Sequence, residues 1–478
     1  MALKFGTSGV RGLVTEMTDQ ACHRYGLIFA RYLLERSPET STVILGGDHR
    51  SSTDQIMAAV ALALEDEGLK VENSGKVPTP TIALRAMATK SGAIMVTGSH
   101  IPEDRNGIKF YMPWGEILKP DEEAMSKALA ELAPTDDSRF DANGMLLKPH
   151  SLPEEDQLAR DAFIDRYLNF FPKDALEGLR LVVYQHSTVL RELYIEIFES
   201  LGAEVIPVGW SDSFVPVDTE AVDAPEQLRA WTLEHQADAL ISADGDGDRP
   251  LLVNEKGDVI RGDILGILAS QKLGARGVAS PVSCNTSLEA CGSFEKVLRS
   301  RIGSPFVIAA MEELNATGME PVVGYEANGG YLTGSSLTLE GCSGELSPLP
   351  TRDAVLPILA VLYGAQKQGL SSSQNKLPQR ITDGLLLRGV DLEKAKLLLK
   401  GLEDKNSSES KTLAAAFGPP SSTDLTDGTR FTFTSGVILH FRPSGNAPEF
   451  RCYTETSPSD HLEDIKKKAE DFLLSYIS

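Results

Sequence analysis

The chain lacks the features that mark membrane, exported and disulfide-bonded proteins. No apolar run reaches the ~18 residues of a membrane-spanning helix, and the first residues show no basic stretch followed by an apolar one. We therefore expect a cytoplasmic protein with no membrane partner. The cysteines are scattered, odd in number and form no CxxC pair (Cys22, Cys284, Cys291, Cys342 and Cys452). This pattern favours reduced thiols over a disulfide framework or a zinc site.

Positive charge is also scarce. The sequence has 46 lysines and arginines against 68 aspartates and glutamates, a formal net charge of −22. Nucleic acids and anionic membranes are bound by basic patches, so we expect neither as a partner. An anionic substrate would have to be captured by a locally basic site. At 478 residues the chain is too long for one hydrophobic core, and we expect about three or four domains.

Apolar runs and helical patterns alternate along most of the chain. Strands are predicted at 42–46, 93–96, 180–184, 204–208, 238–242 and 321–324, and helices at 53–67, 188–201 and 225–236. Such alternation indicates parallel sheets covered by helices on both faces. The rhythm occurs three times, which predicts three similar mixed α/β domains at residues 1–150, 151–260 and 261–370.

The last part of the chain has a different pattern. Serine-rich stretches over 371–425 indicate a linker plus loops, 430–454 is strand-like, and 459–476 has the pattern of an amphipathic helix. We expect a smaller α+β domain at residues 371–478.

Three polar loops each follow a predicted strand. They are Thr97–His100, Asp244–Arg249 and Tyr325–Gly330. Open α/β sheets bind ligands beyond the carboxyl ends of their strands, so we expect the three loops to face one central cleft.

The loop Asp244-Gly245-Asp246-Gly247-Asp248-Arg249 is the most informative motif. Carboxylates at every second position, separated by glycines, are suited to converge on a hard divalent cation. The spacing mimics an EF-hand, but Arg249 stands where that loop needs glycine, and the flanks are strand-like. The other alternative is an acidic surface turn. Arg249 is unusual in a pure metal cage and natural beside a phosphate, and we predict a Mg²⁺ site for phosphoryl transfer.

The loop with Ser99 predicts a phosphoserine whose charge Lys109 neutralises, although an ordinary turn serine is the alternative. In the third loop, Glu326 and Asn328 have the spacing to bind adjacent sugar hydroxyls, against the alternative of a glycine-rich turn. Near the C-terminus, 442–448 followed by Arg451 has the composition of a phosphate nest or, alternatively, of a strand-to-turn connection.

Together these motifs resemble the α-D-phosphohexomutase family, and within it the bacterial phosphomannomutase/phosphoglucomutase group. The motifs are FGTSGVRG (5–12), TGSH with NGIK (97–109), DGDGDR (244–249), EANGG (326–330) and RPSGNAPEFR (442–451). The resemblance runs from Phe5 to about Glu455. It implies four domains around one deep cleft, a phosphosugar substrate, Mg²⁺ and a monomer or homodimer.

The resemblance also implies roles for single residues. Ser99 would carry the phosphoryl group and share Mg²⁺ with Asp244, Asp246 and Asp248. The substrate-binding residues would be Arg249, Glu326, Asn328, Arg442, Ser444, Gly445, Asn446 and Arg451. Lys109 is our candidate for proton transfer, with Arg11 and His100 as rivals.

The chain departs from the family pattern in three loops. Gly98 and Ile101 stand where TASHNP is usual, Asn328 replaces a serine, and Asn446-Ala447 replace the threonine and glutamate of SGTEP. These changes leave the nucleophile and the metal ligands in place and bear on sugar preference. The sugar loop also lacks the histidine-ended form of phosphoglucosamine mutases.

The predicted function is reversible phosphate transfer between O6 and O1 of a hexose, for mannose phosphates and also glucose phosphates. It would proceed through phospho-Ser99 and a hexose 1,6-bisphosphate, which also serves as activator. The alternatives are a phosphoglucosamine mutase, a metal-dependent sugar phosphatase with water as acceptor, and a non-catalytic phosphosugar-binding protein.

Overall fold

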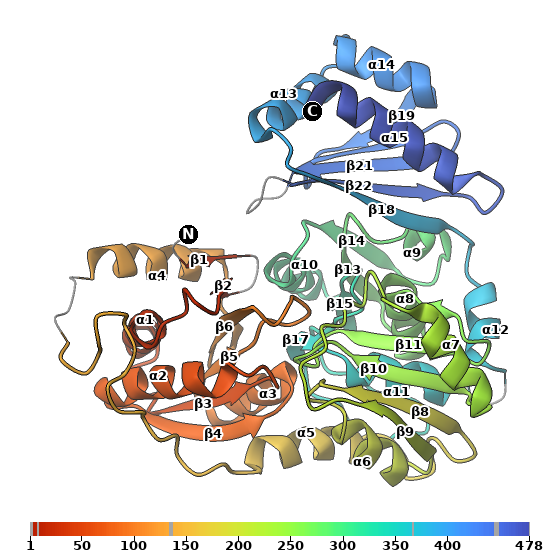
Figure 1. Cartoon of the computed structure of the whole chain (residues 1–478). Helices are drawn as coiled ribbons and strands as arrows, with labels where there is room; N and C mark the ends of the chain where they lie inside the picture. Colours follow the sequence, from red (N-terminus) through yellow and green to blue (C-terminus); the bar gives the residue numbers. More distant parts are fainter. Residues whose placement is uncertain (1–2, 7–8, 133–136, 366–367, 444–448, 478) are drawn as a thin grey trace.

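The computed structural model describes residues 3–6, 9–132, 137–365, 368–443 and 449–477. Within these ranges the chain forms four separate sheets, three of them mixed and one antiparallel (Figure 1). The predicted fold class is confirmed, and the strands of each sheet fall inside one of the four predicted ranges. The domain boundaries themselves stay predictions. None of the helices in the described ranges combines the length and the apolar character needed to span a bilayer.

The first sheet has the order β1-β2-β6-β5-β3-β4, with β7 paired to β6. Apolar side chains alternate along its strands: Val43 and Leu45 face the α1/α2 side, whereas Ile44 faces α3. This period of two lets helices cover both faces. The elements are β1 (Lys4–Phe5), β2 (Val10–Leu13), α1 (Asp19–Arg36), β3 (Thr42–Gly47), α2 (Thr53–Asp66), β4 (Lys70–Lys76), α3 (Thr79–Thr89), β5 (Gly92–Val96), β6 (Arg105–Met112), β7 (Gly115–Glu116), α4 (Lys119–Glu131) and α5 (Leu158–Leu168).

The second and third sheets share one hydrophobic core, which extends through α5, α6, α8 and α11. The second sheet is ordered β12-β11-β10-β8-β9 and the third β14-β13-β15-β16-β17. Their elements are β8 (Arg180–His186), α6 (Leu193–Ser200), β9 (Glu204–Trp210), α7 (Pro225–Glu234), β10 (Ala239–Ala243), β11 (Pro250–Asn254), β12 (Val259–Ile260), α8 (Gly262–Lys272), β13 (Gly277–Pro281), α9 (Ser287–Ala290), β14 (Lys296–Ser300), α10 (Ser304–Ala316), β15 (Val322–Tyr325), β16 (Tyr331–Thr333), β17 (Leu349–Asp353), α11 (Val355–Ala365) and α12 (Leu370–Asn375).

The three polar loops occupy equivalent places in these sheets. In each sheet three strands run parallel, and one of them then pairs antiparallel with the next strand in the chain: β5 with β6, β10 with β11, and β15 with β16. The loops join these antiparallel pairs. They are therefore strand-to-strand connections, in agreement with the strand-like flanks of the acidic loop, and they lie at the carboxyl ends of parallel strands.

The fourth sheet is antiparallel, with the order β18-β22-β21-β20-β19, and helices α13, α14 and α15 pack against it (Figure 1). The elements are β18 (Ile381–Arg388), α13 (Leu392–Glu403), α14 (Ser408–Phe417), β19 (Pro420–Asp424), β20 (Thr429–Phe433), β21 (Ile438–Pro443), β22 (Glu449–Thr456) and α15 (Leu462–Ile477). The prediction of a linker plus loops over 371–425 is wrong. Polar residues there cap helices: Asp391 accepts from the first turn of α13, and Ser407 from that of α14.

Candidate active site

Ser99 lies fully buried just after β5. Its Oγ donates a hydrogen bond of 2.6 Å to Oδ2 of Asp244, a residue 145 positions further along the chain. Its backbone has a φ of +57°, in the left-handed region that costs a residue with a Cβ about 1 kcal/mol or more. The structure therefore brings the predicted serine to the predicted acidic loop, in a strained conformation held by its surroundings.

Arg50 binds the backbone of the serine loop, the connection between β5 and β6 that contains Ser99. Its guanidinium donates to the backbone oxygens of Ser99, Pro102 and Arg105 at 3.0, 2.7 and 3.0 Å, and it forms a fully buried ion pair with Asp48. It also stacks on the ring of Phe214 in the second domain, 3.9 Å from the ring centre. Buried donors that all find acceptors specify one backbone path, so Arg50 fixes the loop.

Two glycines allow this close approach. A Cβ at Gly98 would lie 2.6 Å from Cζ of Arg50, so a side chain here would displace the buried guanidinium. A Cβ at Gly245 would lie 2.8 Å from the backbone oxygen of Ser99 and 2.9 Å from the Phe214 ring. The glycines of the acidic loop thus serve packing against the serine loop as well as the turn itself.

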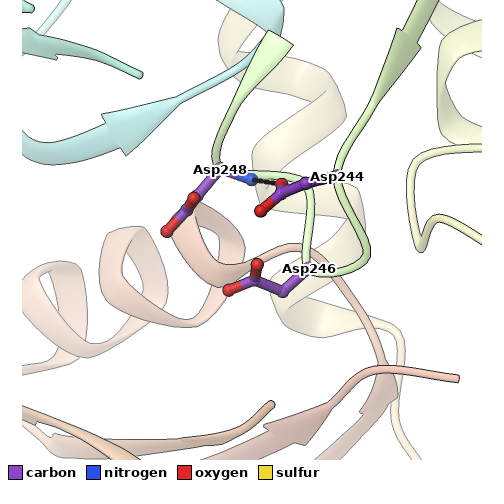
Figure 2. A group of neighbouring side chains, drawn as sticks. All are labelled: Asp244, Asp246 and Asp248. Atoms are coloured by element: carbon purple, nitrogen blue, oxygen red, sulfur yellow. Dashed lines mark hydrogen bonds between the residues drawn. The ribbon is translucent and has the colours of Figure 1, made fainter. Parts of the chain in front are cut away.

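Asp244, Asp246 and Asp248 turn their carboxylates toward one another in the loop between β10 and β11 (Figure 2). Each offers a ligand oxygen, these atoms lie within 4.8 Å of one another, and all three residues are buried. The Asp248 amide donates to Asp244 Oδ1 at 3.2 Å, which closes the turn. Burial and repulsion from its two neighbours raise the pKa of Asp244 well above its usual range.

The other two aspartates are compensated by cations. The Lys109 ammonium donates to Oδ2 of Asp246 and of Asp248 at 2.6 and 2.7 Å, and Arg352 donates to the same Asp248 oxygen at 2.8 Å. Burial opposes ionisation of both aspartates, but Lys109 and Arg352 outweigh it and lower the pKa of each carboxyl. Thr79, at the start of α3, also donates to Asp246 Oδ2 at 2.6 Å.

The remaining oxygens make the acidic loop suitable for a metal. Oδ1 of Asp246 and Oδ1 of Asp248 are buried and accept no hydrogen bond within the described residues. Unpaired carboxylate oxygens in such a place are costly, and a hard divalent cation is the partner that satisfies several at once. The residues present therefore fit a metal held by Asp244, Asp246 and Asp248.

His100 and Arg249 meet beside the serine. Arg249 donates to His100 Nδ1 at 2.8 Å, and the same nitrogen lies 3.3 Å from Ser99 Oγ. Burial, together with the charges of Arg249 and Arg11, lowers the pKa of His100 to about 2, so its ring is neutral at pH 7. The neutral His100 therefore accepts from Arg249 beside the serine, whose single hydroxyl proton goes to Asp244.

Arg11 lies on β2 opposite Gly107 of β6, two residues before Lys109. Burial and repulsion from Arg249 lower the pKa of Arg11 to about 10. Arg11 remains a cation at neutral pH and adds positive charge on the side of the acidic loop from which Lys109 comes.

The loop between β15 and β16 (326–330), called the sugar loop here, is joined to the acidic loop. Arg352 donates to Glu326 Oε2 at 3.0 Å, and Glu326 and Asn328 are both buried. Asn328 Oδ1 accepts from the Gly330 amide at 2.9 Å, and its backbone oxygen accepts from Thr219 of the second domain at 2.8 Å. The side-chain amide of Asn328 thus caps its own turn.

The two arginines predicted to bind phosphate in the fourth domain, Arg442 and Arg451, make separate contacts. Arg442 on β21 and Arg451 on β22 are register partners. Arg442 donates to Asp427 at 3.1 Å, and Arg451 to the Tyr453 hydroxyl at 3.4 Å. Within the described residues, no hydrogen bond or ion pair joins them to the other loops. The predicted contributions of Ser444, Gly445 and Asn446 lie outside the described residues.

Sequence reasoning missed Arg50, Arg352 and Thr79. All three lie outside the polar loops from which the site was predicted. Arg352 is the penultimate residue of β17, where the sequence Thr351-Arg352-Asp353 carries a charged pair into a buried strand end. Charge at a buried strand end was the available signal.

The fold places the chain among multidomain α/β proteins with three mixed sheets and one antiparallel sheet. A phosphoglucomutase/phosphomannomutase family protein from Burkholderia thailandensis superposes with a TM-score of 0.74 at 20% identity, covering 98% of this chain and 97% of that one. Family models for phosphoglucomutase/phosphomannomutase alpha/beta/alpha domains I and III match residues 2–135 and 261–381. The chain belongs to the phosphoglucomutase/phosphomannomutase family.

Curated relatives cover almost the whole chain. A phosphomannomutase from Sinorhizobium fredii is 42% identical over 473 residues, covering 97% of both chains. A phosphomannomutase from Salmonella muenchen is 42% identical over 476 residues, covering 98% of this chain and 95% of its own. A phosphoglucosamine mutase from Alkalilimnicola ehrlichii is more distant, at 29% identity over 94% of this chain and 92% of its own.

Proposed function

We propose that this protein is a phosphohexomutase that interconverts hexose 6-phosphate and hexose 1-phosphate, with mannose phosphates as substrates and glucose phosphates accepted as well. Whole-length similarity to phosphomannomutases supports the activity and the substrate class. The structural observation that carries the proposal is the 2.6 Å bond between Ser99 Oγ and Asp244, which joins the predicted nucleophile to the predicted metal loop.

In the proposed reaction, phospho-Ser99 transfers its phosphoryl group to the free hydroxyl of the bound sugar phosphate. The bond from Ser99 Oγ to phosphorus breaks as a bond from the sugar oxygen to phosphorus forms. The product is a hexose 1,6-bisphosphate, which turns around and returns its other phosphate to Ser99. The same site therefore serves both ends of the molecule, with the bisphosphate as intermediate and activator.

The charges around Ser99 explain why the proposal includes a cation. A phosphate on Ser99 Oγ would stand directly against the Asp244 carboxylate, and like charges at that distance repel strongly. We assign Mg²⁺ to Asp244, Asp246, Asp248 and an oxygen on Ser99. When bound, it would offset the charge that develops on the transferred phosphoryl group.

Proton transfer at the sugar hydroxyl falls to Lys109 in this proposal. It is buried, it reaches Asp246 and Asp248, and it lies on the strand that carries the end of the serine loop. Arg11 is the closest rival, because its lowered pKa brings its proton nearer to release. His100, whose pKa is lowered to about 2, is a weak base by comparison.

The remaining predicted residues bind the substrate. Glu326 and Asn328 would contact sugar hydroxyls, and Arg249 would contact phosphate near the serine. Arg442 and Arg451, adjacent on β21 and β22, would hold the phosphate that does not react. Ser444, Gly445 and Asn446 complete that phosphate site in the proposal.

Ser99→Ala tests the nucleophile. We expect loss of nearly all turnover of mannose 1-phosphate and of protein labelling by ³²P-labelled hexose bisphosphate, because no oxygen is left to carry the phosphoryl group. The matched control is Ser74→Ala, since Ser74 is a buried serine of the same domain whose hydroxyl has no partner in the described residues. A variant without Ser99 that keeps the wild-type rate would show that the nucleophile is another residue.

A substrate comparison tests the activity itself. Mannose 1-phosphate, glucose 1-phosphate and glucosamine 1-phosphate are assayed with catalytic bisphosphate, and isomerised sugar and released inorganic phosphate are both measured. We expect the mannose substrate to be fastest and phosphate release to be small. Phosphate release equal to sugar consumption would identify a phosphatase instead.

A further inference from the structure

Arg352 joins two loops of the candidate active site that come from different domains. Its Nε and one terminal nitrogen donate to Asp248 Oδ2 at 3.1 and 2.8 Å, and the other terminal nitrogen donates to Glu326 Oε2 at 3.0 Å. The residue is 4% exposed. The planar guanidinium therefore fixes the direction in which each carboxylate lies.

The strand end that carries Arg352 is anchored on both sides. Thr351 Oγ1 donates to Glu116 of the first domain at 2.8 Å. Asp353 accepts from the Tyr167 hydroxyl at 2.7 Å and from the Val355 amide at the start of α11 at 2.8 Å. The base of the Arg352 side chain is thus held by neighbours on either side, which makes it a rigid support for its head group.

The sugar loop is packed onto the same arginine. A Cβ at Gly330 would lie 2.5 Å from Cδ of Arg352, so the loop can approach the arginine stem only because this residue is glycine. Glu326 and Gly330 also close the turn with a backbone bond of 3.1 Å. Arg352 therefore contacts both ends of the EANGG turn.

Arg352 leaves one oxygen of each carboxylate available. Asp248 Oδ1 accepts no hydrogen bond in the part of the chain that the structure describes, and Arg352 donates to Oε2 of Glu326 and not to its Oε1. We propose that Arg352 is a positioning residue that orients Glu326 toward the sugar hydroxyls by anchoring it to Asp248 of the metal loop. The inference rests on the proposed function, because it takes Glu326 as a sugar-binding residue.

The test compares Arg352→Lys with wild type on hexose 1-phosphate and on monodeoxy analogues, each lacking one ring hydroxyl. A lysine keeps the charge but cannot hold two carboxylates in a fixed plane. We expect kcat/KM for the parent substrate to fall about tenfold to hundredfold, as for loss of a hydrogen bond to a charged group. Removing the hydroxyl that Glu326 binds should lower kcat/KM less in Arg352→Lys than in wild type. The reason is that the variant already holds this hydroxyl poorly.

The matched control is Arg166→Met. Arg166 is also a buried arginine, and it links α5 to Ser347 without touching the acidic or sugar loop. We expect it to lose stability while keeping the wild-type penalty for each deoxy analogue. If Arg352→Lys lowers kcat/KM equally on all substrates, the fall caused by each missing hydroxyl is unchanged. Arg352 would then have only a structural role, and the proposal would be overturned.

A double-mutant cycle gives a second measurement. If Arg352 acts through Glu326, the losses in kcat/KM from Arg352→Lys and Glu326→Gln will be non-additive, whereas additive losses would contradict it. Calorimetry measures the affinity of the same variants for hexose 6-phosphate and its deoxy analogues. It tests the contact between Glu326 and the sugar hydroxyl without turnover. A wild type that binds sugar phosphate but does not isomerise it would reject the proposed function and still leave the role of Arg352 testable.

Discussion

Identical side chains in the acidic loop differ in pKa because their neighbours differ. Asp246 and Asp248 each accept from Lys109, whereas Asp244 accepts from the neutral hydroxyl of Ser99. Burial and repulsion from its neighbours raise the pKa of Asp244, and the pKa values of the other two are lowered. The aspartate whose pKa is raised is therefore the one that faces Ser99.

Asp246→Asn tests metal binding at this loop. In wild type, Mg²⁺ at about 100 times its Kd should add about 2.7 kcal/mol to the free energy of unfolding, and chelation by EDTA should abolish turnover. The variant should lose most of the Mg²⁺-induced rise in unfolding temperature, because it lacks one charged ligand. Asp258→Asn, at an exposed carboxylate of the same domain, is the control. Equal stabilisation of all three proteins by Mg²⁺ would place the metal elsewhere.

At the scale of elements, the site depends on three strand-to-strand connections that contact one another. At Gly245 two of them pack closely, because Ser99 and Phe214 occupy the space that a side chain would need. Arg50 holds the serine side of this contact through backbone oxygens. The spacing between the serine loop and the acidic loop is therefore set by packing of main chain against main chain.

Gly245→Ala should disturb that spacing. Its Cβ would meet a backbone oxygen that is held in place, so we expect a loss of about 1–3 kcal/mol in the free energy of unfolding and a fall in kcat of at least about tenfold. Gly384→Ala on β18 is the control, since its Cβ would meet only the Tyr453 ring, at 3.9 Å. Chemical denaturation and a coupled assay measure both effects. Wild-type kcat in Gly245→Ala would show that the loops have room to separate.

The sequence predicted much of this arrangement at the level of elements. Buried strands such as 93–96 and 238–242 are apolar runs bounded by glycine or polar residues, and the structure has them at Gly92–Val96 and Ala239–Ala243. In the fourth domain, α13 and α14 were missed because their capping residues, Asp391 and Ser407, resemble loop composition, whereas the helix predicted at 459–476 is confirmed as α15. Arg352 was missed because its role arises from tertiary contacts with Asp248 and Glu326, which no local spacing encodes.

Across the whole molecule, the hydrophobic cores differ in how many sheets they include. The second and third sheets share one core, whereas the fourth sheet has its own with α13, α14 and α15. Buried histidines (His186 and His440) and half-buried ones (His49 and His100) are spread over these parts, and burial lowers the pKa of His49 and His186 to about 4, that of His100 to about 2, and that of His440 in the same direction.

These histidines predict sensitivity to mild acid. They are neutral in the fold and take up protons near pH 6.5 when the chain unfolds, so their contribution is fully present above that pH and is lost as pH falls toward their folded pKa values. Each adds up to about 1.4 kcal/mol per pH unit to the slope. Urea unfolding at pH 7.5 and 5.5 measures it. His186→Gln should reduce the slope relative to the exposed-site control His461→Gln, and an unchanged slope would contradict the prediction.

The arginine at the end of β17 also has a consequence for biosynthesis. Ser99 and the acidic loop leave the ribosome early, but the side chain that ties Asp248 to Glu326 is added only after about three-quarters of the 478 residues. A nascent chain that stops before Leu349 would carry Ser99 next to aspartates that lack this guanidinium. The growing polypeptide therefore cannot join its acidic loop to Glu326 domain by domain, and this link has to await synthesis of β17.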